Sequence, residues 1–200
     1  LIYSKYKFDL KASEISSNNE FKIMLLSEIE DQSLKYDLEI FHNPHNKMRA
    51  GLMLTYHTFT PQSVTIRNPS MNLFDSKKYY AFENAIYIED EYEFNENIRA
   101  NGGIRLSNYI VKGHRFLNPE PRLSIKRNLR KDFSFKVGYS VMNQYLHLLS
   151  NTGVGLPTDL WVPATEKVKP QNCQQITGGF FKRINFNKEE YNVSIEGYYK

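Results

Sequence analysis

The sequence has almost no cysteine and no long apolar segment. Its single cysteine, Cys173, cannot form an intramolecular disulfide, which excludes a small domain held together by disulfides. No apolar run approaches the roughly 20 residues that a membrane-spanning helix needs, and the mean hydropathy is −0.56. A helical membrane protein is therefore excluded. A membrane β-barrel is not, because its strands interleave polar with apolar residues and lower every hydropathy average.

An excess of charge of one sign is missing as well, and tryptophan is rare. The 26 Lys and Arg residues against 22 Asp and Glu residues give a net charge of only +4. Because the basic residues are scattered rather than clustered, nucleic acid is not expected as a partner. A single Trp stands against 14 Tyr and 13 Phe. Composition rich in Tyr suits β-sheets, and also the aromatic girdles of outer-membrane barrels.

What the sequence has in abundance is strict alternation of apolar and polar residues. It occurs at residues 2–10, 34–40, 80–94, 133–141 and 192–199. A period of two predicts a β-strand with one apolar and one polar face. The run at 80–94 would be roughly 15 residues long, well beyond the usual five or six of a globular strand. We count about ten such strands, an all-β pattern typical of an antiparallel sheet.

The predicted connections differ in length in an alternating order. Short turns are expected at 43–46, 95–98, 128–132 and 186–189, and long irregular connections at 67–78, 112–119 and 152–171. Residues 30–32 are interpreted as a further, short connection. Outer-membrane barrels place short turns at one end and long loops at the other, whereas soluble sandwiches have no reason to do so. We therefore expect the short turns to lie together at one end of the sheet.

The polar face of the predicted strands carries many charges. Five of them are candidate lumen-lining residues: Glu89, Glu91, Arg105, Arg122 and Lys136. A dry core could not hold them, since each buried ion costs several kcal/mol unless it is well paired. An aliphatic set is expected on the opposite face: Leu34, Leu38, Ile86, Ile104, Leu106, Val137, Val141 and Val193. The alternative is that the charged face is the solvent side of a soluble sheet.

No combination of residues points to catalysis. Alternation sends Asp90 to the face opposite Glu89 and Glu91, and Cys173 has no Cys or His at metal-ligand spacing. We therefore expect no enzyme, no cofactor and no metal. Candidate ligand contacts on the loop side are His57, Tyr145, His147, Asp159 and Trp161. For these residues, polar filling and loop packing are the alternatives.

Five segments carry a resemblance to a known family. They are YIEDEYEFNENIRANGGIRLSNY at 87–109, NPEPRLSIKRNL at 118–129, FSFKVGYSVMNQYLHLLSN at 133–151, LPTDLWVPATEKVKPQNCQQITGGF at 156–180 and VSIEGYYK at 193–200. In order and spacing they resemble the barrel of TonB-dependent outer-membrane receptors, in particular those of Bacteroidetes-type bacteria. The matching residues are Tyr87, Asp90, Glu91, Gly103, Arg105, Glu120, Pro121, Arg122, Gln144, His147, Pro157, Asp159, Trp161, Pro163, Lys169, Pro170, Gln171 and Gly178 or Gly179.

The resemblance implies an antiparallel up-and-down transmembrane β-barrel of 22 strands around a plug domain. It also implies import of a siderophore, cobalamin, oligosaccharide or peptide across the outer membrane of a Gram-negative bacterium, with energy from the TonB complex. Outer-membrane lipid and a surface lipoprotein are further expected partners. The chain starts without Met and stops within GYYK, so we expect residues 1–200 to be part of one barrel domain, with the plug and the C-terminal strands outside it. The rival hypothesis is a soluble or secreted β-sheet binding module, such as a carbohydrate-binding domain.

Overall fold

The computed structural model describes residues 1–16, 19–68, 71–150, 159–186 and 189–200, and within them the chain is all-β. The strands are β1 (Ile2–Ser16), β2 (Asn19–Asn43), β3 (Asn46–Asn68), β4 (Met71–Ser76), β5 (Tyr79–Asn95), β6 (Ile98–Val111), β7 (His114–Arg130), β8 (Phe133–Gln144), β9 (Leu146–Ser150), β10 (Asp159–Pro163), β11 (Gln171–Phe186) and β12 (Glu189–Tyr199). Among the described residues, no helix is long and apolar enough to span a membrane.

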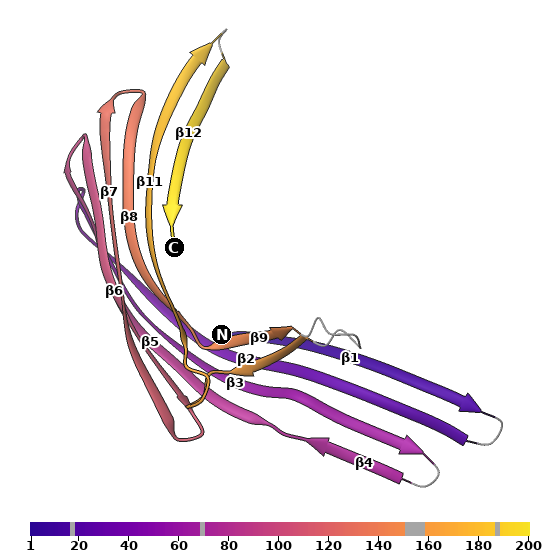
Figure 1. Ribbon diagram of the computed structural model, residues 1–200. Coiled ribbons are helices and arrows are strands. Elements are labelled where there is room, and N and C mark those ends of the chain that lie inside the picture. The colour runs from indigo at the N-terminus through magenta and orange to yellow at the C-terminus, as the bar shows by residue number, and fades with distance from the viewer. Residues whose placement is uncertain (17–18, 69–70, 151–158, 187–188) are drawn as a thin grey trace.

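Ten of these strands form one antiparallel sheet. Its order is β1-β2-β3-β5-β6-β7-β8-β11-β12, and β4 pairs with the far end of β3. Neighbours in the sheet are thus neighbours along the chain, apart from β4 and the separate hairpin of β9 and β10. Figure 1 shows that the sheet curves strongly and that this hairpin lies on its concave side. This is the fold of an antiparallel up-and-down barrel, seen as an open section, as the alternation predicted.

The pairing register divides the side chains into two faces. Directly opposite residues of an antiparallel pair lie on the same face. Ile104 is opposite Ile88 and Pro121, and Val137 is opposite Ile125 and Gly178. One row of the other face runs through Glu89, Gly103, Arg122, Ser140 and Gln175. The register confirms that the predicted aliphatic set lies on one face, and it places the five predicted charges on the other.

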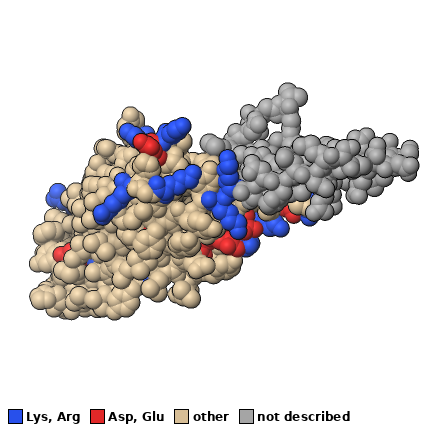
Figure 2. All heavy atoms as spheres, turned by 90° about the horizontal axis from the view of Figure 1, so that it is seen from below, with Lys and Arg blue, Asp and Glu red and all other residues tan. Residues whose placement is uncertain are grey.

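The apolar face is open rather than covered by a second sheet. Ile86 is 61% exposed, Leu123 57% and Ile195 75%, although buried aliphatic side chains are the rule in a sandwich core. Val141 is the exception at 9%, and it lies just beyond Ser140, where β8 stops pairing with β7. Figure 2 shows a broad area at its lower left with hardly any charged side chain, and groups of Lys and Arg above it.

Three of the predicted short turns, 43–46, 95–98 and 128–132, lie together at one end of the sheet, as predicted, whereas the tip of the fourth, residues 187–188, lies outside the described part of the chain. Asparagine side chains close two of them, since Asn43 Oδ1 accepts a hydrogen bond from the His45 amide and Asn95 Oδ1 accepts one from the Asn97 amide, both at 2.9 Å. Backbone hydrogen bonds then join each of these turns to the neighbouring part of the sheet: Glu93 N to His45 O at 2.8 Å, Asn128 N to Asn97 O at 2.7 Å, and Arg183 N of β11 to Asp132 O at 2.8 Å. We call this edge the turn end.

Two predicted connections are wrong. Residues 112–119 do not form a long loop, because Lys112 and Gly113 alone make the turn and β7 begins at His114. Both residues have positive φ, 48° and 79°, as a two-residue hairpin turn of the primed type requires. The Lys112 ammonium lies 3.9 Å from the centre of the Tyr79 ring, which favours this turn without an Asn at its first position.

Residues 30–32 are not a connection either. They lie inside β2, which runs through 25 residues, and Asp31 is paired with His57 of β3. Three consecutive polar residues resemble a break, but Asp31 is on the inner face, where His57 contacts it. The predicted long connections 67–78 and 152–171 contain β4 and β10, and residues 69–70 and 151–158 lie outside the described part.

Candidate functional site

The hairpin of β9 and β10 covers part of the concave, charged face. Beneath it lies a hydrophobic cluster that joins several strands to the hairpin, made of Ile29, Phe59, Ala81, Tyr109, Val111, Tyr145 and Ala164. Leu146 and Trp161 of the hairpin pack against this cluster from above. The inner face therefore changes along the strands, from exposed charges near the turn end to a buried mixture of apolar and polar side chains where the hairpin covers it.

Tyr145 links the hairpin to the wall of the sheet. Its ring stacks on Tyr109 with 4.6 Å between ring centroids. Its hydroxyl oxygen lies 2.6 Å from Ser107 Oγ and accepts a hydrogen bond from Asn118 Nδ2 at 2.9 Å. Ser107 in turn donates to Glu120 at 2.8 Å. The hairpin is thus held by stacking and by a chain of hydrogen bonds that ends at a buried carboxylate.

Arg105 occupies the centre of this polar network. Its guanidinium donates to Glu120 Oε2 at 2.9 Å and to Glu83 Oε1 at 3.2 Å. Glu120 is only 2% exposed, so its charge needs this partner. The guanidinium and the hydroxyl donor offset the desolvation penalty of the buried carboxylate. Loss of either partner would leave the charge of Glu120 insufficiently compensated and destabilise the network.

His57 extends the network toward β2. Its Nδ1 lies 2.7 Å from Asp31 Oδ1, and its Nε2 lies 3.6 Å from Glu83 Oε2. The ring is 5% exposed and stacks on Phe59 at 5.6 Å. His57 is therefore fixed on two sides by carboxylates and on a third by an aromatic ring. Within the described residues, no group of three or more His, Cys, Asp or Glu is arranged to hold a metal ion.

The structure brings some of the predicted ligand contacts together and separates others. His57 and Tyr145 both contact Tyr109, on opposite sides of the network. Trp161 packs on the hydrophobic cluster, and His147 is buried within the hairpin with no hydrogen-bond partner for Nε2. Asp159 begins β10 opposite Ser150. Ligand contact by these five residues stays a prediction.

The predicted lumen-lining charges lie closer to the turn end. Arg49 donates to Glu89 at 3.2 Å, and Arg99 lies 3.2 Å from Glu91. Arg105 and Arg122 border a hollow of about 460 Å³ on the inner face, together with Lys35, Asp37, Arg49 and Tyr87. Lys136 is exposed on the same face, opposite Lys126 and Gly179. These side chains form a mixed-charge, water-accessible surface.

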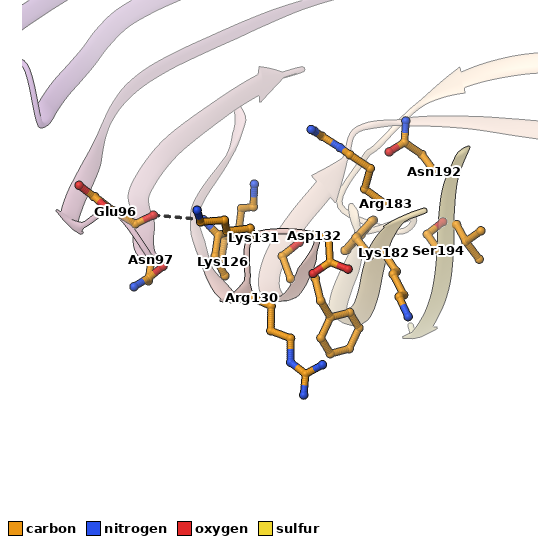
Figure 3. A pocket seen from close by; sticks show the side chains of 15 residues that line it. Glu96, Asn97, Lys126, Arg130, Lys131, Asp132, Lys182, Arg183, Asn192 and Ser194 are labelled. Carbon is orange, nitrogen blue, oxygen red and sulfur yellow. Dashed lines mark hydrogen bonds between the residues drawn. The ribbon is translucent and has the colours of Figure 1, made fainter. Parts of the chain in front are cut away.

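A second hollow lies at the turn end. It measures about 810 Å³ and is lined largely by polar and charged side chains of the turns. Figure 3 shows its labelled residues, with Arg183 and Asn192 on one side of the sheet and Arg130 and Lys182 extending to the other. The hollow is therefore lined by side chains from both faces of the sheet, at the edge where the turns lie.

Several residues of the network were not predicted from the sequence. Asp31 was assigned to a connection, and Ser107, Tyr109 and Asn118 lie in the segments that carry the family resemblance but were not named as candidates. Alternation assigns Tyr109 and Ser107 to the face of Arg105, which is the one signal that could have pointed to them. It cannot show that the hairpin folds back onto that face.

Comparison with solved structures identifies the fold. The chain is similar to the siderophore receptor PirA from Acinetobacter baumannii, with a TM-score of 0.55 and 14% identity over 96% of this chain and 34% of that one. For PirA from Pseudomonas aeruginosa the TM-score is 0.54 and the identity 18%, over 91% of this chain and 37% of that one. For the copper transporter OprC the TM-score is 0.60 and the identity 13%, over 98% of this chain and 38% of that one.

No protein-family model matches the sequence, and no curated protein matches it significantly. The chain spans about a third of the length of the solved structures that it matches. The residues described here thus share the barrel fold of two siderophore receptors and a copper transporter, and correspond to a section of that barrel.

Proposed function

We propose that the chain is part of the barrel of a TonB-dependent outer-membrane receptor, which imports a scarce ligand into a Gram-negative cell. The observation that carries this proposal is the pair of faces on one up-and-down sheet. An exposed aliphatic face suits contact with hydrocarbon, and a concave face with mixed charges suits a wet, filled lumen. The similarity to siderophore receptors and a copper transporter supports the same function.

The rival, a soluble binding module, accounts poorly for the apolar face. A soluble monomer rarely exposes a contiguous apolar patch larger than a few hundred Å², whereas here the exposed aliphatic residues extend from Leu34 in β2 to Ile195 in β12. In a lipid environment the same aliphatic residues contact hydrocarbon instead of water, so their exposure is not unfavourable. The solved structures that the chain resembles are named receptors and a transporter, which fits transport.

The partners and ligand follow from this proposal. A plug domain of the same longer chain would lie inside the barrel and face its wet, charged inner surface, and the TonB complex would act on that plug. The proposed ligand is a siderophore, a cobalamin, an oligosaccharide or a peptide. A surface lipoprotein is a further proposed partner. The receptor would belong to the Bacteroidetes-type subgroup. Two of the similar structures are named siderophore receptors, so ferric siderophores are the first probes.

Uptake by the longer chain that carries this segment tests the proposal. It would be expressed in a Gram-negative host without siderophore receptors of its own, and accumulation of ⁵⁵Fe-siderophores, labelled cobalamin, a labelled maltodextrin and a labelled peptide would be measured. We expect the protein in the outer-membrane fraction, with at least one probe accumulating only when TonB is present. A soluble periplasmic protein, or accumulation equal in cells with and without TonB, would contradict the proposal.

A further inference from the structure

Three cations lie on the apolar face near the turn end, where the pattern otherwise places aliphatic and aromatic residues. The register assigns them to that face: Arg127 is opposite Phe135, and both Arg130 and Lys182 are opposite Phe133. Figure 3 shows Arg130 and Lys182 extending from the same side of the sheet, away from Arg183. We call these three residues the outer cation cluster. All three are exposed.

Aromatic rings lie between these cations. Phe180 stacks on Phe133 with 5.8 Å between centroids and contacts Phe135 at 5.0 Å. Aromatic residues on the outer face of a barrel gather at the boundary between hydrocarbon and water. Farther from the turns, the same face continues with Leu123, Ile125 and Val137. The outer cation cluster thus lies at the membrane boundary rather than at mid-membrane depth.

Some basic residues of the inner face have a carboxylate partner, whereas these three cations have none among the described residues. On the inner face Arg49, Arg105 and Arg183 each form an ion pair. In the described part of the chain no member of the outer cation cluster forms one. A guanidinium beside a hydrocarbon layer needs an anion at the same depth, and phosphate matches it through two parallel N–H···O bonds.

We propose that the outer cation cluster binds the phosphate group of an anionic glycerophospholipid in the membrane leaflet at the turn end. Arg127 and Arg130 on β7 and Lys182 on β11 surround the headgroup, the rings of Phe133, Phe135 and Phe180 lie beneath it, and an acyl chain extends along Leu123 and Ile125. The charge favours phosphatidylglycerol over zwitterionic phosphatidylcholine. This inference rests on the membrane placement of the proposed function.

The test measures lipid retained by the full longer chain. The protein would be folded into detergent micelles containing equal amounts of phosphatidylglycerol and phosphatidylcholine, and bound lipid would be counted by native mass spectrometry. The variant Arg127→Gln/Arg130→Gln/Lys182→Gln removes the cluster. The matched control Lys126→Gln/Lys136→Gln/Arg183→Gln removes the same charge from the inner face. Inorganic phosphate, in large molar excess over the phosphatidylglycerol, serves as a competitor. It shows whether the cluster recognises a lipid or any free anion.

We expect the unchanged protein to retain phosphatidylglycerol in preference to phosphatidylcholine. A cation near an anionic lipid surface contributes roughly a fivefold change in affinity, so the outer variant should lose at least tenfold in phosphatidylglycerol affinity while the control stays within about twofold. Equal loss in both variants, no loss in either, or full displacement by phosphate would overturn the inference alone. A chain that does not fold into micelles or bilayers would overturn the proposed function, and this inference with it.

Discussion

Replacing Arg105 by leucine is expected to lower the free energy of unfolding of the membrane-inserted protein by about 3–5 kcal/mol. The guanidinium lies 2.9 Å from Glu120 and 3.2 Å from Glu83. Removing it leaves a carboxylate that is 2% exposed without its counter-ion. Water cannot readily reach Glu120, because the side chains of Arg105, Ser107 and Asn143 surround its carboxylate. Urea titration of the full chain in lipid vesicles measures the change.

The control for this experiment is Arg122→Leu. Arg122 lies on the same face and is exposed, and it forms no ion pair in the described part of the chain. Its replacement should change stability by no more than about 0.5 kcal/mol. The double variant Arg105→Leu/Glu120→Leu should lose less than the sum of the two single variants, since it removes the unpaired charge as well. Equal losses for Arg105→Leu and Arg122→Leu would contradict the buried network.

Replacing Val137 by arginine should cost about 1–3 kcal/mol of folding free energy in bilayers, because a cation on the lipid face, between the aromatic boundary and the midplane, loses hydration. Val137 lies between Ile125 and Gly178 on the aliphatic face, well inside the turn end. Folding of the full chain into vesicles, followed by urea titration, gives the number. The cost should fall in bilayers of shorter acyl chains, which bring the interface closer to residue 137.

The neighbouring residue supplies the control. Lys136 is exposed on the inner face, where charges are mixed and wet, so Lys136→Gln should change stability by about 0–1 kcal/mol. Two adjacent positions of one strand are thus expected to differ because they face opposite media. A loss at residue 136 as large as that at residue 137 would argue against a wet lumen.

The elements of the sheet were largely predictable, because alternation is a local signal. The run 80–94 predicted β5, observed at Tyr79–Asn95, and the alternation from Phe133 predicted β8 and its faces. The turn at Lys112 and Gly113 was missed because a left-handed lysine has no strong sequence signature. The break at 30–32 was misjudged because the partner of Asp31, His57, is 26 residues away.

The candidate site was less predictable, since it depends on register and on long-range packing. Sequence reasoning named Arg105, His57 and Tyr145 separately. That they belong to one continuous network follows from pairings such as Arg105 with Glu120, and from the hairpin folding back over Tyr109. Neither is encoded in a local pattern, because the same alternation is compatible with a hairpin that extends away from the sheet.

Thiol labelling shows which face of the sheet meets lipid and which meets water. In the full chain with Cys173 replaced by serine, single cysteines at Ile104, Val137 and Val193 would be compared with single cysteines at Arg122 and Lys136, using a water-soluble maleimide on folded, bilayer-inserted protein. We expect the first three to stay unlabelled until the protein is unfolded in urea, whereas the last two react in the folded state. Labelling of residues 104, 137 and 193 in the folded, inserted protein would contradict this assignment of the faces, because that face would then meet water.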